Sequence, residues 1–223
     1  MKPYYEHGGI TIYHGDCREI LPTLSRSALI VTDPPYGIRY VHGGGGGAIS
    51  NNPRANFRRQ REAITGDAEP FDASVLLTFE EVIAFGADHY AQQLPHGRWL
   101  VWDKTGGGKF SGLDSFSDVE MAWHSRNGAS RIFHYLWKGV CQAGEKGQRR
   151  THPSQKPIAL MQWVIGQAKS VGVIVDPFAG SGTTLRAAKN LGRSAIGIEI
   201  EERYCEIAAK RLSQEVLDFG GAA

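Results

Sequence analysis

The sequence predicts a single α/β domain built on a mostly parallel β-sheet, and three observations lead to this prediction. Strands and helices alternate along the last third of the chain, which is typical of parallel sheets covered by helices on both faces. A continuous apolar run at 28–32 ends in two prolines, as a buried strand of such a sheet would. The chain has 223 residues, of which 41% are hydrophobic and 22% charged, which suits one domain with a full core.

The first two thirds of the chain contain a helix signal and several strand signals. Apolar residues at helical spacing predict a helix within 71–94, and they are Val75, Leu76, Phe79, Val82 and Ile83. A short helix is expected over 17–24. Alternating or continuous apolar runs predict strands over 10–13, 28–32, 99–102 and 131–137 and within 119–123.

The last third of the chain is the most regular. It predicts helices over 158–169, 183–191 and 202–217, with strands over 171–175 and 194–198. Irregular segments at 37–70, 103–117 and 139–156 are long enough to be functional loops, and they start near strand ends, where open parallel sheets bind ligands. The five consecutive glycines at 43–47 predict local mobility.

Composition excludes several classes of protein. No apolar run of about 18 residues is present and the N-terminus lacks the apolar core of a signal peptide, so we expect a cytoplasmic protein. Cys17, Cys141 and Cys205 lie far apart, which argues against a structural zinc site or a disulfide framework. The net charge is only +2, but basic residues cluster at 54–61 and 146–156, and these clusters are solvated faces or contacts to phosphates.

A glycine loop follows the strand at 171–175 and opens the next helix. It reads Asp176-Pro177-Phe178-Ala179-Gly180-Ser181-Gly182-Thr183-Thr184. Glu199 comes 23 residues after Asp176, at the end of the next strand, where nucleotide-binding βαβ units place an acid for ribose hydroxyls. The loop therefore predicts a nucleotide site, and the alternative is a tight strand–helix turn that binds nothing.

Asp176 indicates which nucleotide the loop would bind. Its carboxylate would repel a pyrophosphate by about 1 to 4 kcal/mol at about 4 Å, and the loop lacks the Lys-Ser/Thr pair of a P-loop. S-adenosylmethionine instead carries an ammonium and a sulfonium, which a carboxylate favours, while the helix N-terminus can bind its carboxylate group. The sequence therefore predicts S-adenosylmethionine as the cofactor.

The tetrapeptide Asp33-Pro34-Pro35-Tyr36 ends the strand at 28–32 and suits chemistry on an aromatic amine. The lone pair of such an amine is delocalised into the ring, and two acceptors on its N–H groups localise it. Asp33 would supply one acceptor and the Pro34 carbonyl the other, with Pro35 stiffening the loop. Tyr36 would stack on a base extruded from its helix. The alternative is a strand end stiffened by prolines.

These motifs resemble those of the DNA amino-methyltransferases, the adenine-N6 and cytosine-N4 enzymes. The tetrapeptide resembles their catalytic motif, the glycine loop their cofactor loop, 151–157 the segment that closes over the cofactor, and 12–17 the segment whose acid contacts the cofactor adenine. The catalytic motif precedes the cofactor loop, as in the permuted beta group. The resemblance implies a Rossmann-like S-adenosylmethionine-dependent methyltransferase fold with a mostly parallel seven-stranded sheet, helices on both faces and a circularly permuted motif order.

The resemblance also implies site residues and partners. The catalytic residues would be Asp33, Pro34, Pro35 and Tyr36. The cofactor residues would be Asp16, Cys17, Asp33, His152, Ser154, Gln155, Lys156, Asp176, Phe178, Gly180, Ser181, Gly182, Thr183 and Glu199. The substrate would be double-stranded DNA, and small target-recognition insertions are expected within 38–70 and 103–150 of a single domain spanning 1–223. The DNA contacts would be Arg54, Arg58, Arg59, Arg61, Lys146, Arg149 and Arg150. A cognate restriction nuclease and a homodimer are compatible with the resemblance, and no metal or membrane is implied.

Several alternatives stay open at the level of sequence. Adenine N6 is favoured over cytosine N4 by the resemblance alone, because both amino groups need the same acceptors. An RNA or a protein glutamine amide is a less favoured substrate, although the same nitrogen chemistry could serve it. A nucleic-acid-binding module with an inactive pocket is a further alternative, which the intact Asp33 disfavours. No cysteine accompanies the catalytic loop, which argues against carbon-5 cytosine chemistry, and no clear carboxylate cluster supports a nuclease.

Overall fold

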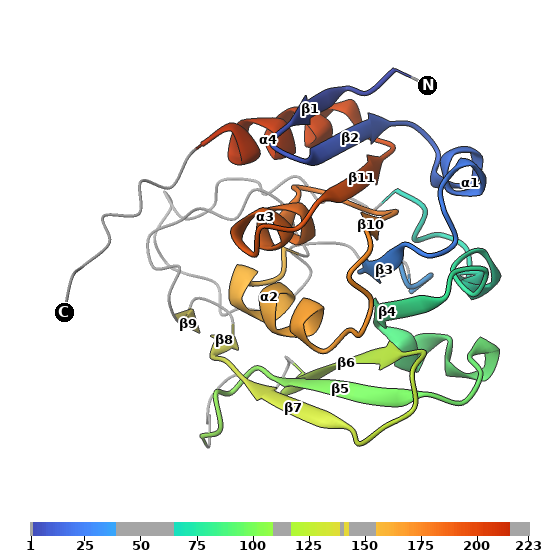
Figure 1. The fold of residues 1–223 in the computed structure, drawn as a ribbon. Helices are drawn as coiled ribbons and strands as arrows, with labels where there is room; N and C mark the ends of the chain where they lie inside the picture. The colour runs from blue at the N-terminus through green and yellow to red at the C-terminus, as the bar shows by residue number, and fades with distance from the viewer. Residues whose placement is uncertain (1, 39–64, 109–116, 139–140, 143–154, 215–223) are drawn as a thin grey trace, which may run out of the picture.

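A nine-stranded mixed sheet forms the centre of the described part of the protein. The computed structural model describes residues 2–38, 65–108, 117–138, 141–142 and 155–214. The strand order is β1-β2-β11-β10-β3-β4-β6-β5-β7, which Figure 1 shows from top to bottom. The strands are β1 (Tyr5–His7), β2 (Ile10–His14), β3 (Leu29–Thr32), β4 (Glu81–Phe85), β5 (Arg98–Asp103), β6 (Val119–His124), β7 (Arg131–His134), β10 (Ile174–Asp176) and β11 (Ala195–Glu199). A separate two-stranded ribbon pairs β8 (Trp137–Lys138) with β9 (Cys141–Gln142).

The predicted seven strands are all present, and two further strands correct the expected count. β1 pairs antiparallel with β2 and was not predicted, and β4 replaces part of the helix expected within 71–94. β6 runs antiparallel to both of its neighbours, β4 and β5, so the sheet is mixed. The adjacent strands β2, β11, β10, β3 and β4 are all parallel, and their carboxyl ends therefore share one edge of the sheet.

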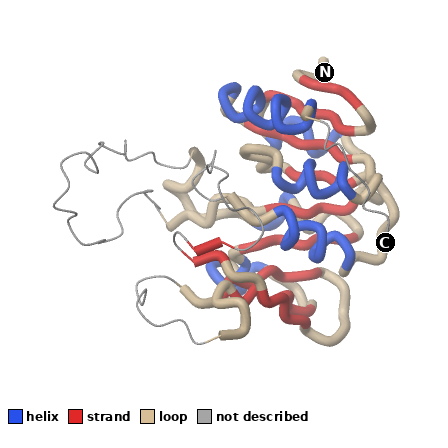
Figure 2. Tube along the Cα trace, turned by 90° about the vertical axis from the view of Figure 1, so that its left-hand side faces the viewer, coloured by secondary structure: helices blue, strands red, loops and turns tan. Residues whose placement is uncertain are grey.

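Helices cover the sheet unequally. One face packs against α2 (Ile158–Gly166), α3 (Thr183–Asn190) and α4 (Glu202–Ser213), which lie side by side (Figures 1 and 2). The other face packs against the four-residue α1 (Cys17–Ile20) and short 3-10 turns such as Leu21–Thr23 and Ala73–Val75. Helical segments thus lie on both faces, as expected. Within the described ranges, no helix is long and apolar enough to cross a bilayer.

The helix predicted within 71–94 is wrong. Asp72 caps a single 3-10 turn by accepting a hydrogen bond from the Ser74 N–H, and the chain then enters β4, all five residues of which are buried. β4 pairs with β3 on one side and β6 on the other, so it is buried between two strands and two layers. A short apolar run in such a place is compatible with either structure, and its tertiary pairing decides.

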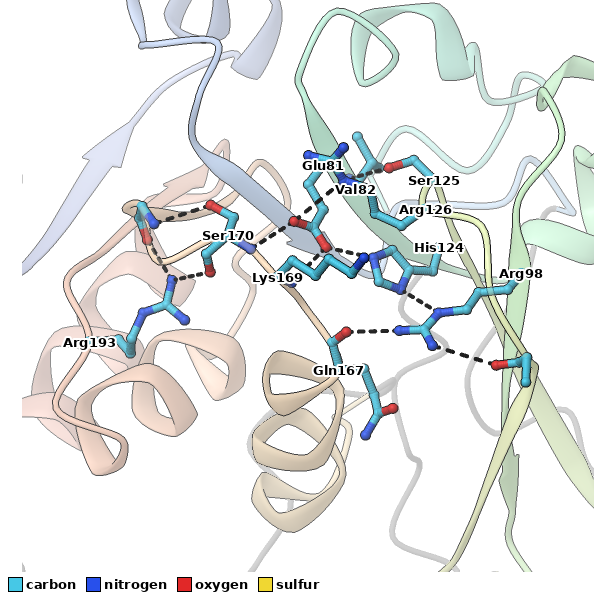
Figure 3. Close-up of polar contacts among 12 residues, drawn as sticks. Glu81, Val82, Arg98, His124, Ser125, Arg126, Gln167, Lys169, Ser170 and Arg193 are labelled. Carbon is cyan, nitrogen blue, oxygen red and sulfur yellow. Dashed lines mark hydrogen bonds and ion pairs between the residues drawn. The ribbon is translucent and has the colours of Figure 1, made fainter.

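A buried polar network fixes the start of β4 to the chain after α2 (Figure 3). Glu81 is 0% exposed and accepts hydrogen bonds from the N–H groups of Lys169 and Ser170, at 2.9 and 2.8 Å. His124 Nε2 lies 2.8 Å from the same carboxylate, and Arg98 donates to His124 Nδ1 at 3.0 Å. Because the guanidinium has only donors, Nδ1 must accept and Nε2 must carry the proton that binds Glu81. This network lies at the edge opposite the carboxyl ends of the parallel strands.

Candidate functional site

Four adjacent parallel strands each end near a carboxylate. Asp33 directly follows β3, Asp176 ends β10, Glu199 ends β11, and Asp16 comes two residues after β2. The register places β10 between β3 and β11, so these acids share the carboxyl edge of the sheet. Carboxylates gathered at one edge favour cationic ligands and disfavour phosphates.

Asp33 is held by two side chains. Tyr36 donates its hydroxyl to Oδ1, and Lys156 donates to Oδ2 at 2.6 Å. The Asp33 side chain is 18% exposed. Burial raises the pKa of Asp33, the ammonium of Lys156 opposes this shift, and the Glu120 carboxylate adds to it. The sequence placed Lys156 in a segment that closes over a cofactor, but here its ammonium contacts the carboxylate of the tetrapeptide.

Alternating charges extend from Asp33 along this edge. Lys156 Nζ lies 3.1 Å from Glu120 Oε2, and Lys104 Nζ lies 2.9 Å from Glu120 Oε1. The two lysines lower the pKa of Glu120 to about 2, although burial alone would raise it. The carboxylates on either side raise the pKa of Lys156, against the effect of burial. Asp33, Lys156, Glu120 and Lys104 thus form a row of alternating charges.

The ring of Tyr36 lies over a glycine. Gly86, which follows β4, has φ +62°, and a Cβ there would come within 2.0 Å of Tyr36 Cε1. The Tyr36 ring also stacks on the ring of His89, with centroids 5.1 Å apart and planes 20° apart. An alanine at position 86 would therefore be strained and would displace Tyr36.

The segment after the tetrapeptide is anchored by a buried acid. Asp67 is 3% exposed and accepts a hydrogen bond from the Gly37 N–H at 2.8 Å and from the Ile38 N–H at 3.3 Å. Gly37 has φ +75°, and a Cβ there would come within 2.5 Å of the Glu69 carbonyl oxygen. Asp67 thus fixes how the chain leaves the tetrapeptide, in which Pro34 is buried and Pro35 half-buried.

Asp176 begins the glycine loop and is bonded to the neighbouring strand. Its Oδ1 accepts hydrogen bonds from Thr32 Oγ1 at 2.8 Å and from the Phe178 N–H at 3.2 Å. Because the carboxylate is buried, its pKa rises to about 6, and hydrogen bonds from Thr184 and Thr32 oppose the shift. Thr32 directly precedes Asp33, so this bond ties the two motifs together.

Glu199 and α4 brace the rest of the loop. Glu199 accepts from the Gly180 N–H at 2.7 Å and from the Glu201 N–H at 2.8 Å, and burial raises its pKa. Arg211 of α4 donates to the Ser181 carbonyl at 2.6 Å and lies 3.4 Å from Thr183 Oγ1. Gly182, with φ +77°, turns the chain into α3, and a Cβ there would come within 2.9 Å of Ala208 Cβ.

The other predicted cofactor residues that the structure describes lie around the carboxyl edge of the sheet. Asp16 caps α1 and pairs with the exposed Arg18, and the Gly15 N–H bonds the Glu199 carbonyl at 2.9 Å. Cys17 is buried in the core, which raises the pKa of its thiol to about 11. Phe178 is half-buried with an edge-to-face contact to Phe71, and Gln155 is half-buried beside Lys156.

Several predicted site residues lie outside the described residues. They are His152 and Ser154 of the cofactor set, and all of the expected DNA contacts, namely Arg54, Arg58, Arg59, Arg61, Lys146, Arg149 and Arg150. Their roles stay predictions.

The structure adds residues that sequence reasoning missed. Glu120, Gly86, His89 and Asp67 contact the tetrapeptide or its partners, and no local pattern marks them, because each reaches the site only through strand pairing or loop contacts. The carboxylate of Asp103, next to Lys104, accepts hydrogen bonds from the N–H groups of Thr105 and Gly107, so β5 ends in a capped turn.

Comparisons with known proteins find DNA methyltransferases among the relatives of this chain. The family model described as DNA methylase, N6_N4_Mtase, matches residues 113–210. The chain is 46% identical to the type II methyltransferase M.HinfI of Haemophilus influenzae, over 92% of this chain and 68% of that protein.

Solved structures share the fold. The M1.HpyAVI–SAM complex matches with a TM-score of 0.52 and 24% identity, covering 91% of this chain and 99% of that one. The cytosine-N4-specific PvuII DNA methyltransferase matches with a TM-score of 0.60 and 15% identity, covering 97% and 91%. The expected Rossmann-like methyltransferase fold is confirmed. On the strength of its identity to M.HinfI, this chain belongs to the family of DNA amino-methyltransferases, the adenine-N6 and cytosine-N4 enzymes.

Proposed function

We propose that this chain transfers a methyl group from S-adenosylmethionine to the N6 amino group of an adenine flipped out of double-stranded DNA. The observation that carries the proposal is the pairing of Asp33 and Asp176 at neighbouring strand ends, joined through Thr32. One carboxylate is placed to orient an amine and the other to attract a cation.

The edge has the donor set that S-adenosylmethionine requires. Asp176, Glu199 and Asp16 offer carboxylates toward an ammonium, ribose hydroxyls and an adenine amine respectively, while the N-terminus of α3 offers N–H groups to a carboxylate. Glu199 already accepts two backbone N–H groups, and its remaining lone pairs are available to hydroxyls. When bound, S-adenosylmethionine supplies the electrophilic methyl group. A complex with SAM is known for the similarly folded M1.HpyAVI.

The tetrapeptide would act on the base. Asp33 and the Pro34 carbonyl accept hydrogen bonds from the two N–H groups of the target amine and localise its lone pair. Contacts with Gly86 and His89 fix the position of the Tyr36 ring, and the base would stack on the part of the ring that these contacts leave free. Positioning and charge placement, without a covalent intermediate, supply the rate.

Cytosine N4 is the second candidate target. The PvuII enzyme, which has the best-matching fold of the solved structures described above, is cytosine-N4-specific. The family resemblance of the Asp-Pro-Pro-Tyr tetrapeptide favours adenine. Both amines present two N–H groups to the same acceptors, so product analysis decides between them.

The partners and the location follow from the same proposal. The basic residues within 54–61 and 146–150 are the candidates for DNA phosphate contacts. A cytoplasmic location, a cognate restriction nuclease and a homodimer are further predictions from the resemblance.

The test is incubation with methyl-labelled S-adenosylmethionine and unmethylated DNA, followed by nucleoside chromatography. We expect labelled N6-methyl-2′-deoxyadenosine, and label in N4-methyl-2′-deoxycytidine would instead establish the second candidate. Asp33→Ala should abolish transfer while cofactor binding by calorimetry is retained. Transfer that persists in this variant would refute the role of Asp33, and no transfer by the native chain would refute the proposed function.

A further inference from the structure

Lys156 is shared between two carboxylates from different parts of the sheet. Its Nζ lies 2.6 Å from Asp33 Oδ2 and 3.1 Å from Glu120 Oε2. The side chain is 8% exposed, and the ammonium lies 5.2 Å from the ring centroid of Phe85. A single buried cation thus serves two anions where water has little access.

The two contacts of Lys156 are not equivalent. Lys156 donates a hydrogen bond to Asp33, whereas its 3.1 Å contact with the buried Glu120 Oε2 lacks hydrogen-bond geometry, and no other described residue donates to this oxygen. The other oxygen of Glu120 accepts from Lys104 at 2.9 Å. A buried carboxylate oxygen without a donor is costly, so Glu120 holds an unused acceptor directly beside the ammonium.

Asp33, in contrast, has both oxygens engaged. Oδ1 accepts from Tyr36 and Oδ2 from Lys156. An amine that donates to Asp33, as the proposed function requires, must therefore share an oxygen that already accepts one hydrogen bond, and the bond from Lys156 weakens when its acceptor is shared. A cation that loses this bond without finding another would itself be left buried and underbonded.

We propose that Lys156 is a positioning residue that exchanges its hydrogen bond between two acceptors. Before the base enters, Lys156 holds Asp33 in its orientation. When the base amine donates to Asp33 Oδ2, Lys156 transfers its hydrogen bond to Glu120 Oε2. This inference rests on the proposed function and adds a residue pair that controls the occupancy of Asp33.

The electrostatics around Asp33 make the inference measurable. The ionisable groups facing Asp33 are Lys156, Glu120, Tyr36, Tyr90 and Asp176, from five separate segments. Removing the ammonium raises the pKa of Asp33, and removing the Glu120 charge lowers it. Lys156→Met and Glu120→Gln therefore shift the pKa of Asp33 in opposite directions.

The experiment compares these two variants with the native chain. Single-turnover methyl transfer is measured against pH, and the Asp33 carboxyl is titrated by ¹³C NMR, with Asp33→Asn for assignment. We expect the acidic limb to move to higher pH in Lys156→Met and to lower pH in Glu120→Gln. We also expect Glu120→Gln to be at least tenfold slower on its plateau, because Lys156 then has no second carboxylate to bind. Glu206→Gln, which removes the acid of an exposed ion pair with Lys210, is the matched control and should behave as native.

The outcomes separate this inference from the proposed function. Limbs that move in the same direction, or a native plateau rate in Glu120→Gln, would overturn the exchange while leaving an active methyltransferase. Glu120→Gln is isosteric, so it keeps the test decisive if Lys156→Met does not fold. A native chain without transfer would remove the proposed function and this inference together.

Discussion

Two carboxylates, Glu81 and Asp33, lie at opposite edges of the same sheet and are satisfied in different ways. Glu81 is wholly buried and binds two backbone N–H groups and the His124 ring. Asp33 is partly exposed, and among the described residues its hydrogen bonds come from the side chains of Tyr36 and Lys156. Backbone donors are fixed by the fold, whereas side-chain donors can move aside. We therefore call the strand ends at Glu81 the closed edge, because the fold fixes the donors there. We call the strand ends at Asp33 the exchanging edge, because the side-chain donors there can be replaced.

The largest effect is expected from breaking the closed edge. Glu81→Ala leaves the Lys169 and Ser170 N–H groups and the His124 ring without their acceptor, which should lower the free energy of unfolding by about 3–5 kcal/mol in urea titrations. The exposed Glu206→Ala is the control and should change little. A Glu81→Ala loss below about 1 kcal/mol would show that the closed edge contributes little to stability.

The stability that Glu81 contributes should also depend on pH. Burial alone would raise its pKa, but hydrogen bonds from Lys169, His124 and Ser170 outweigh this and lower it. A carboxyl with a lowered pKa stabilises the fold above its ordinary pKa and loses that contribution as the pH falls through the lowered value. The native-minus-variant difference in unfolding free energy should therefore shrink in acid.

The complementary change at the exchanging edge should act on rate and not on stability. Asp33→Asn keeps the shape of the side chain but replaces one acceptor with a donor, so methyl transfer should fall by about 10²- to 10³-fold. The free energy of unfolding should change by less than about 1 kcal/mol, because Lys156 keeps Glu120 as a partner. A large stability loss with unchanged transfer would reverse the comparison between the two edges.

A further prediction concerns how the protonation of Asp176 changes the affinity for the cofactor. Its pKa of about 6 means that its carboxylate is lost as the pH falls from 7 to 5, unlike that of an ordinary aspartate. Affinity for the cationic S-adenosylmethionine should fall about tenfold over this range, measured by calorimetry. Asp176→Asn should bind more weakly at pH 7 and lose this part of the pH dependence. A native affinity that is flat from pH 7 to 5 would contradict the assignment.

The smallest effect is expected at the glycine beneath Tyr36. Gly86→Ala places a side chain at positive φ and against the Tyr36 ring, which should cost about 1 kcal/mol of stability. The displaced ring should raise the KM for DNA more than that for the cofactor. Gly192→Ala, at φ +66° with nothing within 4 Å, is the matched control for backbone strain alone. Equal effects of the two variants on the KM for DNA would contradict a role for the Tyr36 position.

Much of the fold could be predicted from the sequence, because its strands are apolar runs ended by prolines, glycines or acids. The error at β4 has a physical cause. Val82 and Ile83 continue the helical spacing of Val75, Leu76 and Phe79, and only the pairing of β4 with β3 and β6 selects the strand. β1 was missed because it is a three-residue edge strand with little burial.

The candidate site could be predicted only where its residues are local in sequence. The tetrapeptide and the glycine loop are short motifs, and strand order brings them together as expected for a parallel sheet. Lys156 lies 123 residues from Asp33, and Glu120 is a single acid at the start of a strand. No periodicity marks such a pair, so its contacts emerge only from the fold.

Helix α2 connects the two edges, and this arrangement has a mechanical consequence. Lys156 lies two residues before the helix, and the backbone groups that bind Glu81 lie three and four residues after it. The nine-residue helix is a rigid spacer of about 14 Å. Because the chain after α2 is bound to Glu81, the start of the helix holds the Lys156 ammonium at a fixed position beside Asp33. A substitution that breaks the hydrogen bonds of Glu81 would therefore shift α2 and misplace the Lys156 ammonium, without changing any residue that contacts Asp33.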